Sequence, residues 1–206
     1  MKYHDLILIL SMMAAGGAVA TPASQAQATG ESRHEIPANA SSYRRSFAFH
    51  RIPDVKMVDM NGSQFSLREG LHGDEPVLLN FIFTRCAAIC PQMSATFRHV
   101  QEKLGKNRGK VRMVSIFIDP ENDTPARLRE YAEKYQAGPQ WHMLTGNVED
   151  SIAIQRAFGA FRGGSKPDYS PVTFIRAGGA DKTWVRLDGL ASASDIIREY
   201  RMLAGS

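Results

Sequence analysis

The chain has only two cysteines among its 206 residues, and they lie four positions apart. Cys86 and Cys90 belong to the stretch FTRCAAICP, directly after an apolar run and just before a predicted helix. Because four residues are about one helical turn, the two sulfurs can meet as a disulfide or hold one metal ion together. The free N–H groups and the positive dipole end of a helix N-terminus stabilise a thiolate, the nucleophilic and metal-binding form of cysteine. The pair therefore predicts thiol–disulfide exchange, soft-metal binding, or both.

A purely structural disulfide is the alternative interpretation of this pair. It would close a loop of about five residues, which contributes roughly 2 kcal/mol in the chain-entropy model, against about 3 kcal/mol for a fifteen-residue loop. Such a bridge stabilises a chain of this size weakly. With two cysteines in all, a disulfide-rich scaffold and a four-cysteine zinc site are both excluded.

The residues around the pair alternate between strand and helix patterns. Two continuous apolar runs, at 76–83 and 111–118, predict strands that are covered on both faces. A proline in the first turn indicates a helix at 91–104 between them, and Thr124-Pro125 indicates the start of another that ends near 136. The remaining predicted elements are a hairpin of 55–59 and 64–67 with a type I′ turn at Asn61-Gly62, a strand at 141–144, a helix at 147–158, paired strands at 172–176 and 184–187, and a closing helix at 194–203. This order predicts an α/β fold with a central mixed sheet flanked by helices.

The first 45 residues have the pattern of an export signal followed by a tether. Residues 6–20 are apolar or small, and Ala18-Val19-Ala20 fits a signal-peptidase site, so 1–20 are predicted to be a signal peptide. Fifteen residues span about 22 Å as a helix, which is short for a bilayer core of about 30 Å; an uncleaved membrane anchor is the lesser alternative. Residues 21–45 predict a flexible tether and 46–206 the folded domain. Export to the periplasm or a similar oxidising compartment would let a disulfide persist.

Composition narrows the class of partner. The chain is 43% hydrophobic and 22% charged, which excludes collagen, coiled coil and wholesale disorder. A net charge of +4 is mild, and the cations form no dense run, so nucleic acid is not an expected partner. The nearest thing to a basic patch is predicted to be a solvated loop, and it consists of Lys103, Lys106, Arg108, Lys110 and Arg112.

Several separated motifs resemble the Sco/SenC family. CAAICP resembles the family's CxxxCP, Ser115 to Pro125 (SIFIDPENDTP) resembles its strand ending in Asp-Pro and Asp-Thr-Pro, and Leu144-Thr145-Gly146 resembles its Leu-Thr-Gly; Leu128 and Tyr131 fall on the helix between. The resemblance covers most of residues 47–203. It implies a thioredoxin-like fold with an N-terminal hairpin extension, and a role in assembling the copper site of cytochrome oxidase. It also implies that Cys86 and Cys90 are the redox pair and the Cu(I) ligands, with exported protein thiols, such as those of an oxidase subunit, as partners.

One departure from the family concerns its third copper ligand. The family has a histidine in an Asp-His-Ser segment, where this chain has Asp168-Tyr169-Ser170. Two thiolates can hold soft Cu(I), whereas Cu(II) prefers nitrogen donors, and thiol–disulfide exchange needs only the cysteines. Tyr169 therefore predicts a weakened Cu(II) site and shifts the expected function toward redox chemistry. Met93 is predicted to be a core residue of its helix, and the remaining histidines are predicted to be surface residues rather than substitute ligands, namely His34, His50, His72, His99 and His142.

Two further residues have two interpretations each, and the function has alternatives. Asp119 either lies at the cysteine rim, as a proton acceptor or hydrogen-bond partner of the loop, or merely ends a strand. Pro171 is either a cis proline facing the cysteines or an ordinary trans proline at the start of a strand. The alternative functions are a non-catalytic adaptor or redox sensor that keeps the fold, and a peroxidase that uses Thr84 and Arg85.

Overall fold

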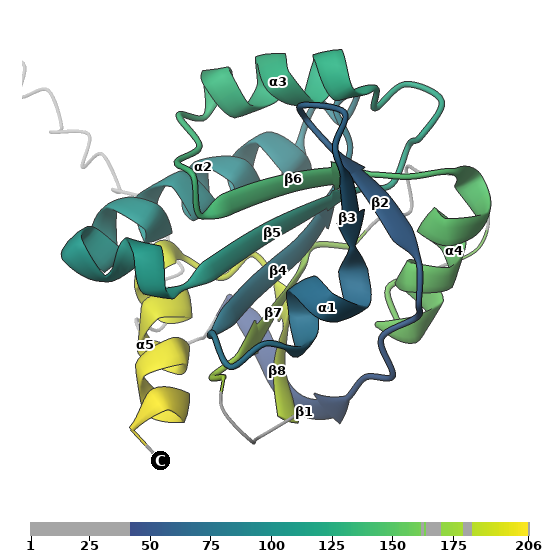
Figure 1. Ribbon diagram of the computed structural model, residues 1–206. Helices are drawn as coiled ribbons and strands as arrows, with labels where there is room; N and C mark the ends of the chain where they lie inside the picture. Colours follow the sequence, from purple (N-terminus) through teal and green to yellow (C-terminus); the bar gives the residue numbers. More distant parts are fainter. Residues whose placement is uncertain (1–41, 162, 164–169, 179–182, 206) are drawn as a thin grey trace, which may run out of the picture. The chain divides into compact units, whose positions relative to one another are not determined.

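The two apolar runs form the centre of the sheet. β4 (Val77–Ile82) and β5 (Arg112–Phe117) are parallel neighbours, with Leu79 opposite Val114. All six residues of β4 are buried, which confirms that this strand is covered on both faces. The computed structural model describes residues 42–161, 163, 170–178 and 183–205, and all strands in these ranges belong to one sheet (Figure 1).

That sheet has eight strands in the order β1-β8-β7-β4-β5-β6-β2-β3. β4, β5 and β6 are parallel and every other neighbouring pair is antiparallel, so the predicted α/β class with a central mixed sheet is confirmed. The other strands are β1 (Tyr43–Phe49), β2 (Lys56–Asp59), β3 (Gln64–Ser66), β6 (Trp141–Thr145), β7 (Val172–Arg176) and β8 (Thr183–Gly189). The helices are α1 (Leu67–His72), α2 (Ile89–Leu104), α3 (Pro125–Lys134), α4 (Val148–Ala157) and α5 (Ala193–Ala204), with a 3₁₀ helix η1 (Gly105–Lys110) after α2. None of the helices in the described ranges has the length and apolar character needed to cross a bilayer.

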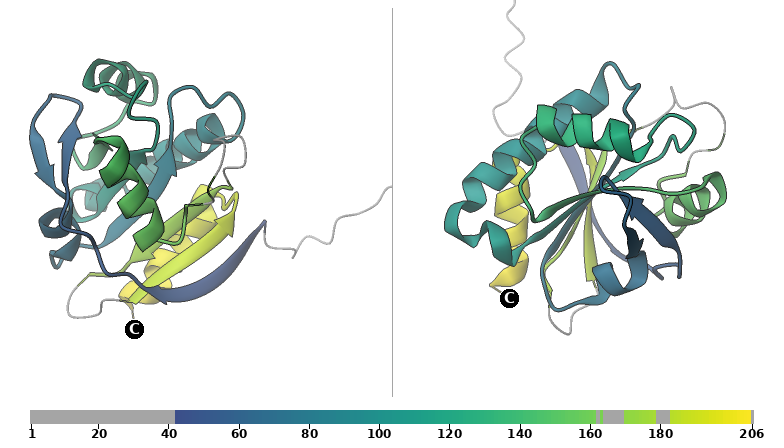
Figure 2. Two further views of the ribbon diagram at one scale, coloured as in Figure 1. Left: turned by 90° about the vertical axis from the view of Figure 1, so that its right-hand side faces the viewer. Right: turned by 45° about the horizontal axis from the view of Figure 1, so that its top comes forward.

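Helices cover both faces of the sheet, as Figure 2 shows. Successive side chains of a strand point to opposite faces, so β4 contributes to two apolar clusters. Leu78 and Ile82 pack in the cluster under α2, α3 and α5. Leu79 and Phe81 pack in the cluster under α1 and α4. A short loop joins the end of β4 to the start of α2. Because β4 is buried on both faces and α2 packs on one of them, both ends of this loop are held in place.

The predicted hairpin is present as β2 and β3, but its turn is not type I′. A type I′ turn needs positive φ at both central residues. Gly62 has φ +81°, whereas Asn61 does not have a positive φ. The reason is Asp59, whose carboxylate accepts the N–H groups of Asn61 and Ser63, each at 2.8 Å. These bonds stabilise a longer turn from Asp59 to Ser63, in which the Asp59 N–H donates to the Ser63 carbonyl and the Gly62 N–H donates to the Asp59 carbonyl.

Three elements were not predicted: β1, α1 and the 3₁₀ helix η1, which occupies part of the segment expected to be a solvated loop. β1 pairs with β8 at the edge of the sheet, and it includes residues 43–45, which the sequence analysis assigned to the tether. Its sequence YRRSFAF places charged and aromatic side chains on exposed positions, so it lacks the apolar alternation on which a strand prediction depends. α1 has six residues after its N-cap Ser66, too few to display a helical period.

Candidate functional site

Cys86 and Cys90 lie in the connection from β4 to α2. α2 begins at Ile89, two residues earlier than predicted, so Cys90 belongs to its first turn and Cys86 to the loop before it. The backbone N–H of Cys90 donates to Cys86 Sγ at 3.2 Å, and the N–H of Cys86 donates to the carbonyl of Phe83 at 3.2 Å. Both thiols are free. The structure therefore brings together the two residues that the spacing paired.

The Cys86 thiol is partly exposed and poised to ionise. Burial alone would raise its pKa, but a hydrogen bond from the Cys90 thiol and several backbone N–H bonds outweigh burial and hold the pKa below its ordinary value. The donating N–H groups belong to Cys90, Ala88 and Ile89. They are donors at the helix N-terminus that have no carbonyl partner within α2, and they point at the sulfur. The anion thus forms where a partner can reach it.

Cys90 has the opposite environment. Its side chain is 0% exposed. Burial, the hydrogen bond to Cys86 and the nearby charges of Cys86 and Asp123 raise the pKa of Cys90 far above its ordinary value, although an N–H of Phe83 opposes the rise. The pair is therefore asymmetric, with an accessible sulfur that ionises readily and a protected one that stays a thiol.

A buried carboxylate holds the loop that carries Cys86. Asp123 is 0% exposed, and its Oδ1 accepts the N–H of Thr84 at 2.9 Å and the hydroxyl of Thr84 at 2.6 Å. Its Oδ2 accepts the N–H of Asp119 at 2.9 Å. Burial raises the pKa of Asp123, while the bonds from Thr84 and Asp119 oppose the rise. The carboxylate links the segment before Cys86 to the loop after β5.

Sequence reasoning named Asp123 only as part of a motif and missed this role. The available signal was Thr84, a polar residue directly after the apolar run at 76–83, where a hydroxyl that is partly buried needs a hydrogen-bond partner. Asp119 is itself buried, and its two carboxylate oxygens accept the side-chain amide of Asn122 at 3.0 Å each. These bonds lie within the turn that follows β5, so of its two interpretations they support the residue that ends a strand and starts a turn.

A hydroxyl group of α3, that of Tyr131, contacts the first turns of α2 at two places. The hydroxyl oxygens of Ser94 and Tyr131 lie 2.8 Å apart and are buried. The Tyr131 hydroxyl also donates to the carbonyl of Cys90 at 3.5 Å. Burial raises the pKa of Tyr131, so this hydroxyl stays neutral and can donate. Sequence reasoning placed Tyr131 on the intervening helix without assigning it this contact.

The remaining predicted residues fall into three groups. Tyr169 and His34 lie outside the described residues. Pro171 precedes β7, and no peptide bond of the described residues is cis, so the ordinary trans interpretation holds. Met93 is 4% exposed, which confirms it as a core residue of α2.

The histidines are engaged elsewhere. His72 and His99 are exposed, as predicted, and bond to the carbonyl of Arg68 and the carboxylate of Glu102. The surface prediction is wrong for the other two described histidines, which are half-buried. His50 Nδ1 bonds to the Ala157 carbonyl at 2.9 Å among aromatic rings, and His142 packs against Phe65. Across the described part of the chain, no group of three or more His, Cys, Asp or Glu side chains is arranged to hold a metal ion.

The peroxidase alternative required Thr84 and Arg85 beside Cys86. Thr84 directs its hydroxyl to Asp123, and Arg85 is exposed. This arrangement speaks against peroxide activation by that pair and favours a loop that is held in place for the cysteines themselves.

Sequence comparison identifies a family. The family model described as SCO1/SenC matches residues 43–174. The SCO1 protein homolog of Bacillus subtilis is 40% identical over 104 residues, which are 50% of this chain and 53% of that protein. An SCO2-like protein of Rickettsia felis is 34% identical over 108 residues, 52% of this chain and 51% of that protein. The chain thus spans about half the length of the curated relatives it matches.

Comparison with solved structures confirms the thioredoxin-like fold of this family. BsSco, a Sco-family cytochrome c oxidase assembly protein in which a disulfide switch was identified, is 27% identical with a TM-score of 0.64, and the match covers 78% of this chain and 96% of BsSco. Arabidopsis thaliana ScoI, solved with copper bound, is 21% identical with a TM-score of 0.63, and the match covers 77% of this chain and 100% of ScoI. A SCO1/SenC family lipoprotein from Bacillus anthracis is 22% identical with a TM-score of 0.65, and the match covers 77% of this chain and 98% of the lipoprotein.

Proposed function

The chain belongs to the SCO1/SenC family, and from that membership we propose that it acts outside the cytoplasm in assembling the copper site of a cytochrome oxidase. Cys86 and Cys90 exchange thiol and disulfide with a partner and hold Cu(I). The observation that carries the proposal is the asymmetry of the pair: Cys86 is accessible with a lowered pKa, and Cys90 is buried beside it with a raised one. The disulfide switch of BsSco, at 27% identity, supports the redox part.

The exchange proceeds in two steps that conserve electrons. The Cys86 thiolate attacks a disulfide of the partner, forming a mixed disulfide and releasing one partner thiolate. Cys90 then gives its proton to the partner thiolate released in the first step and attacks Cys86 Sγ, which forms the Cys86–Cys90 disulfide and releases the second partner thiolate. The partner disulfide gains two electrons, and the cysteine pair loses two. Retention of this reactive pair argues against a non-catalytic adaptor.

Copper is the cargo in this proposal. The two sulfurs suit Cu(I), which accepts thiolate ligands. A copper-bound ScoI of the same fold supports a copper role in general terms. Tyr169 replaces the nitrogen donor expected from the family, so the chain favours Cu(I) over Cu(II).

Titration of the reduced chain with each oxidation state of copper tests this function. We expect one Cu(I) per chain, lost in Cys86→Ser and in Cys90→Ser, together with weak Cu(II) binding. Tyr169→His should strengthen Cu(II) binding more than 100-fold and Cu(I) binding far less, because an added ligand changes affinity by more than the roughly 10- to 100-fold typical of outer-shell changes. Tyr169→Phe is the matched control and should change neither. Tight Cu(II) binding by the unmodified chain would contradict the proposed ligand set.

Export is a separate part of the proposal. It is supported by the apolar segment at 6–20 with its small-residue cleavage site. Intact-mass measurement of the chain recovered from the extracytoplasmic fraction should give a mature protein that begins near Thr21. A mass that retains residues 1–20, recovered with membranes, would favour the anchor.

A further inference from the structure

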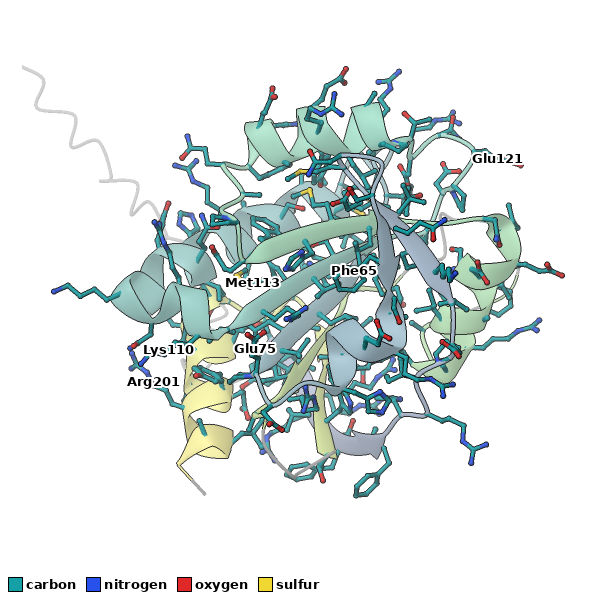
Figure 3. All side chains as sticks on the ribbon, in the orientation of Figure 1. Phe65, Glu75, Lys110, Met113, Glu121 and Arg201 are labelled. Atoms are coloured by element: carbon teal, nitrogen blue, oxygen red, sulfur yellow. The ribbon has the colours of Figure 1, made fainter. Side chains whose placement is uncertain are left out.

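A group of cations lies at the opposite end of α2 from the cysteines. Lys103 near the end of α2, Lys110 at the end of η1 and Arg201 of α5 line one hollow of about 480 Å³. Figure 3 shows Lys110 and Arg201 next to each other. All three are exposed, and none of them forms an ion pair with an acidic side chain of the described residues. α2, η1 and α5 thus each place one unpaired cation at the same hollow.

Polar and apolar side chains together line this hollow. Leu104 and Ile197 are buried beneath it, and Tyr200 forms part of its wall. Two more cations of η1, Lys106 and Arg108, line a second hollow. Cations gathered in this way match the chemistry of an anionic phospholipid, which offers a phosphate at its headgroup.

Nearby acidic side chains do not neutralise this surface. Glu102 pairs with Arg98 at 3.1 Å and bonds to His99 at 3.0 Å. Asp195 pairs with Arg198 at 2.6 Å. The surface formed by Lys103, Lys106, Arg108, Lys110 and Arg201, here called the basic face, therefore keeps its positive charge.

We propose that the basic face docks this domain on a membrane surface rich in anionic phospholipid. Charge complementarity supports this occupant, because each cation near an anionic bilayer adds attraction. The path of the chain supports it as well. The hydroxyl of Tyr43, at the start of β1, accepts a bond from Arg198 at 2.8 Å, and Arg198 lines a hollow together with Lys103 and Arg201. The chain therefore enters the domain beside the basic face, so that, in the alternative case of an uncleaved anchor at 6–20, the same face would be brought to the bilayer.

Docking in this way would hold the redox pair away from the lipid. Cys90 and Lys103 are thirteen residues apart on α2, about 20 Å along its axis. The accessible Cys86 would then face a partner rather than the bilayer. The docking role does not depend on the proposed copper or thiol chemistry.

The test is partition of the full chain onto vesicles of phosphatidylglycerol mixed with phosphatidylcholine, compared with phosphatidylcholine alone. The readout is the ratio of binding to the anionic vesicles over binding to the phosphatidylcholine vesicles. A ratio is used because the apolar segment at 6–20, where it is retained, binds both kinds of vesicle. The triple variant Lys103→Gln, Lys110→Gln, Arg201→Gln removes three cations of the basic face. The matched control removes three exposed cations elsewhere, with Lys56→Gln, Arg68→Gln and Arg127→Gln. Circular dichroism and thiol reactivity verify that both variants are folded.

We expect the ratio to fall about 100-fold in the triple variant, since each cation near the surface contributes about fivefold. The control should lose less than about fivefold, and salt at roughly 1 M should abolish the preference of the unmodified chain. An equal loss in both variants would show attraction by net charge alone and overturn the proposal. So would the absence of any preference for anionic vesicles, or binding to soluble polyglutamate as tight as to vesicles, which would instead indicate an acidic protein partner.

Discussion

Cys86 and Cys90 have different tasks because their surroundings differ, although their side chains are the same. The donors at the start of α2 converge on Cys86 Sγ, and Cys90 sits in the core under the same turn. The spacing of the two residues predicted the pair. It did not predict which sulfur ionises, because that depends on the residue at which the helix begins, and α2 begins two residues before the proline used to place it.

The link between Asp123 and Thr84 gives a prediction at the same scale. Asp123→Ala should lower the free energy of unfolding by about 3 kcal/mol, because it removes the acceptor of one buried and two partly buried donors. It should also raise the pKa of Cys86, because the loop is no longer held against the start of α2. Thr84→Val should cost about 1–2 kcal/mol. The measurements are urea unfolding and the pH dependence of thiolate absorbance.

Thr84→Ser is the control for that prediction, because it retains the hydroxyl that bonds to Asp123. It should keep the pKa of Cys86 at the level of the unmodified protein. If Asp123→Ala lowers stability while the pKa of Cys86 stays where it was, the carboxylate stabilises the fold without positioning the thiol.

The two half-buried histidines predict a loss of stability in mild acid. Burial and the nearby Arg186 lower the pKa of His50, outweighing its bond to the Ala157 carbonyl. Burial and the nearby Arg112 lower the pKa of His142, and together they outweigh the carboxylates of Asp59 and Glu75, which raise it. The unfolded chain therefore binds more protons below pH 6.5, the ordinary histidine value, so stability is lost as pH falls from about 6.5 toward the folded-state values.

The slope of that loss should reach up to about 1.4 kcal/mol per pH unit for each histidine. His50→Phe and His142→Gln should each flatten the plot of unfolding free energy against pH between 7 and 5. The comparison uses slopes, because His50→Phe also leaves the Ala157 carbonyl unpaired. Slopes identical to that of the unmodified chain would show that other groups cause the acid sensitivity.

At the scale of elements, the segment that follows β5 acts as a support for the segment that follows β4. Asp123 in the loop holds Thr84, and Tyr131 of α3 holds Ser94 and the Cys90 carbonyl. The Asp-Pro and Asp-Thr-Pro motif, which the sequence offered only as a likeness, thus has a physical reason. Its polar residues hold the cysteine loop in place, while Thr124 caps α3 by accepting the N–H of Arg127.

The contact between Ser94 and Tyr131 can be tested by a double-mutant cycle. Tyr131→Phe and Ser94→Ala should each lower the unfolding free energy by about 1–2 kcal/mol, since each leaves a buried hydroxyl or carbonyl short of a partner. The double variant should cost less than the sum of the two, with a coupling of at least about 0.5 kcal/mol in urea unfolding. Strictly additive costs would mean that the two hydroxyls do not stabilise each other.

Helices and strands with a clear local sequence signal, such as an apolar run or a helix cap, were predicted well. Those that depend on contacts with distant parts of the chain were not. β4 and β5 are continuous apolar runs, and α3 begins at its predicted cap. β1 is held by pairing with β8 and by Tyr43 and Arg45 bonding to Glu199, partners more than 130 residues away. No local pattern contains that information. The hairpin turn was mistaken because the Asp59 side chain, rather than Asn61-Gly62 alone, decides its shape.

For the whole molecule, the sheet explains why one loop can carry the chemistry. Apolar clusters on both faces bury β4 completely, so the chain that leaves it has a fixed starting point. The α/β class and the family were predictable from separated motifs in the right order. Burial of Cys90 and the role of Asp123 were not, because each depends on elements that meet only after the chain folds. The sequence named Lys103, Lys106, Arg108 and Lys110 of the basic face, but Arg201 joins them only through the packing of α5.

The reactivity of the two thiols in the intact protein tests the central claim most directly. Since the chain has no other cysteine, the mass of the reduced protein during timed alkylation reports both at once, and peptide mapping assigns each. We expect Cys86 to react first, with a pKa below the ordinary cysteine value, and Cys90 to react only after unfolding. A mild disulfide should then convert the unalkylated protein to a Cys86–Cys90 disulfide that dithiols reduce. Faster reaction at Cys90, equal rates at both, or two thiols that resist oxidation would contradict the account.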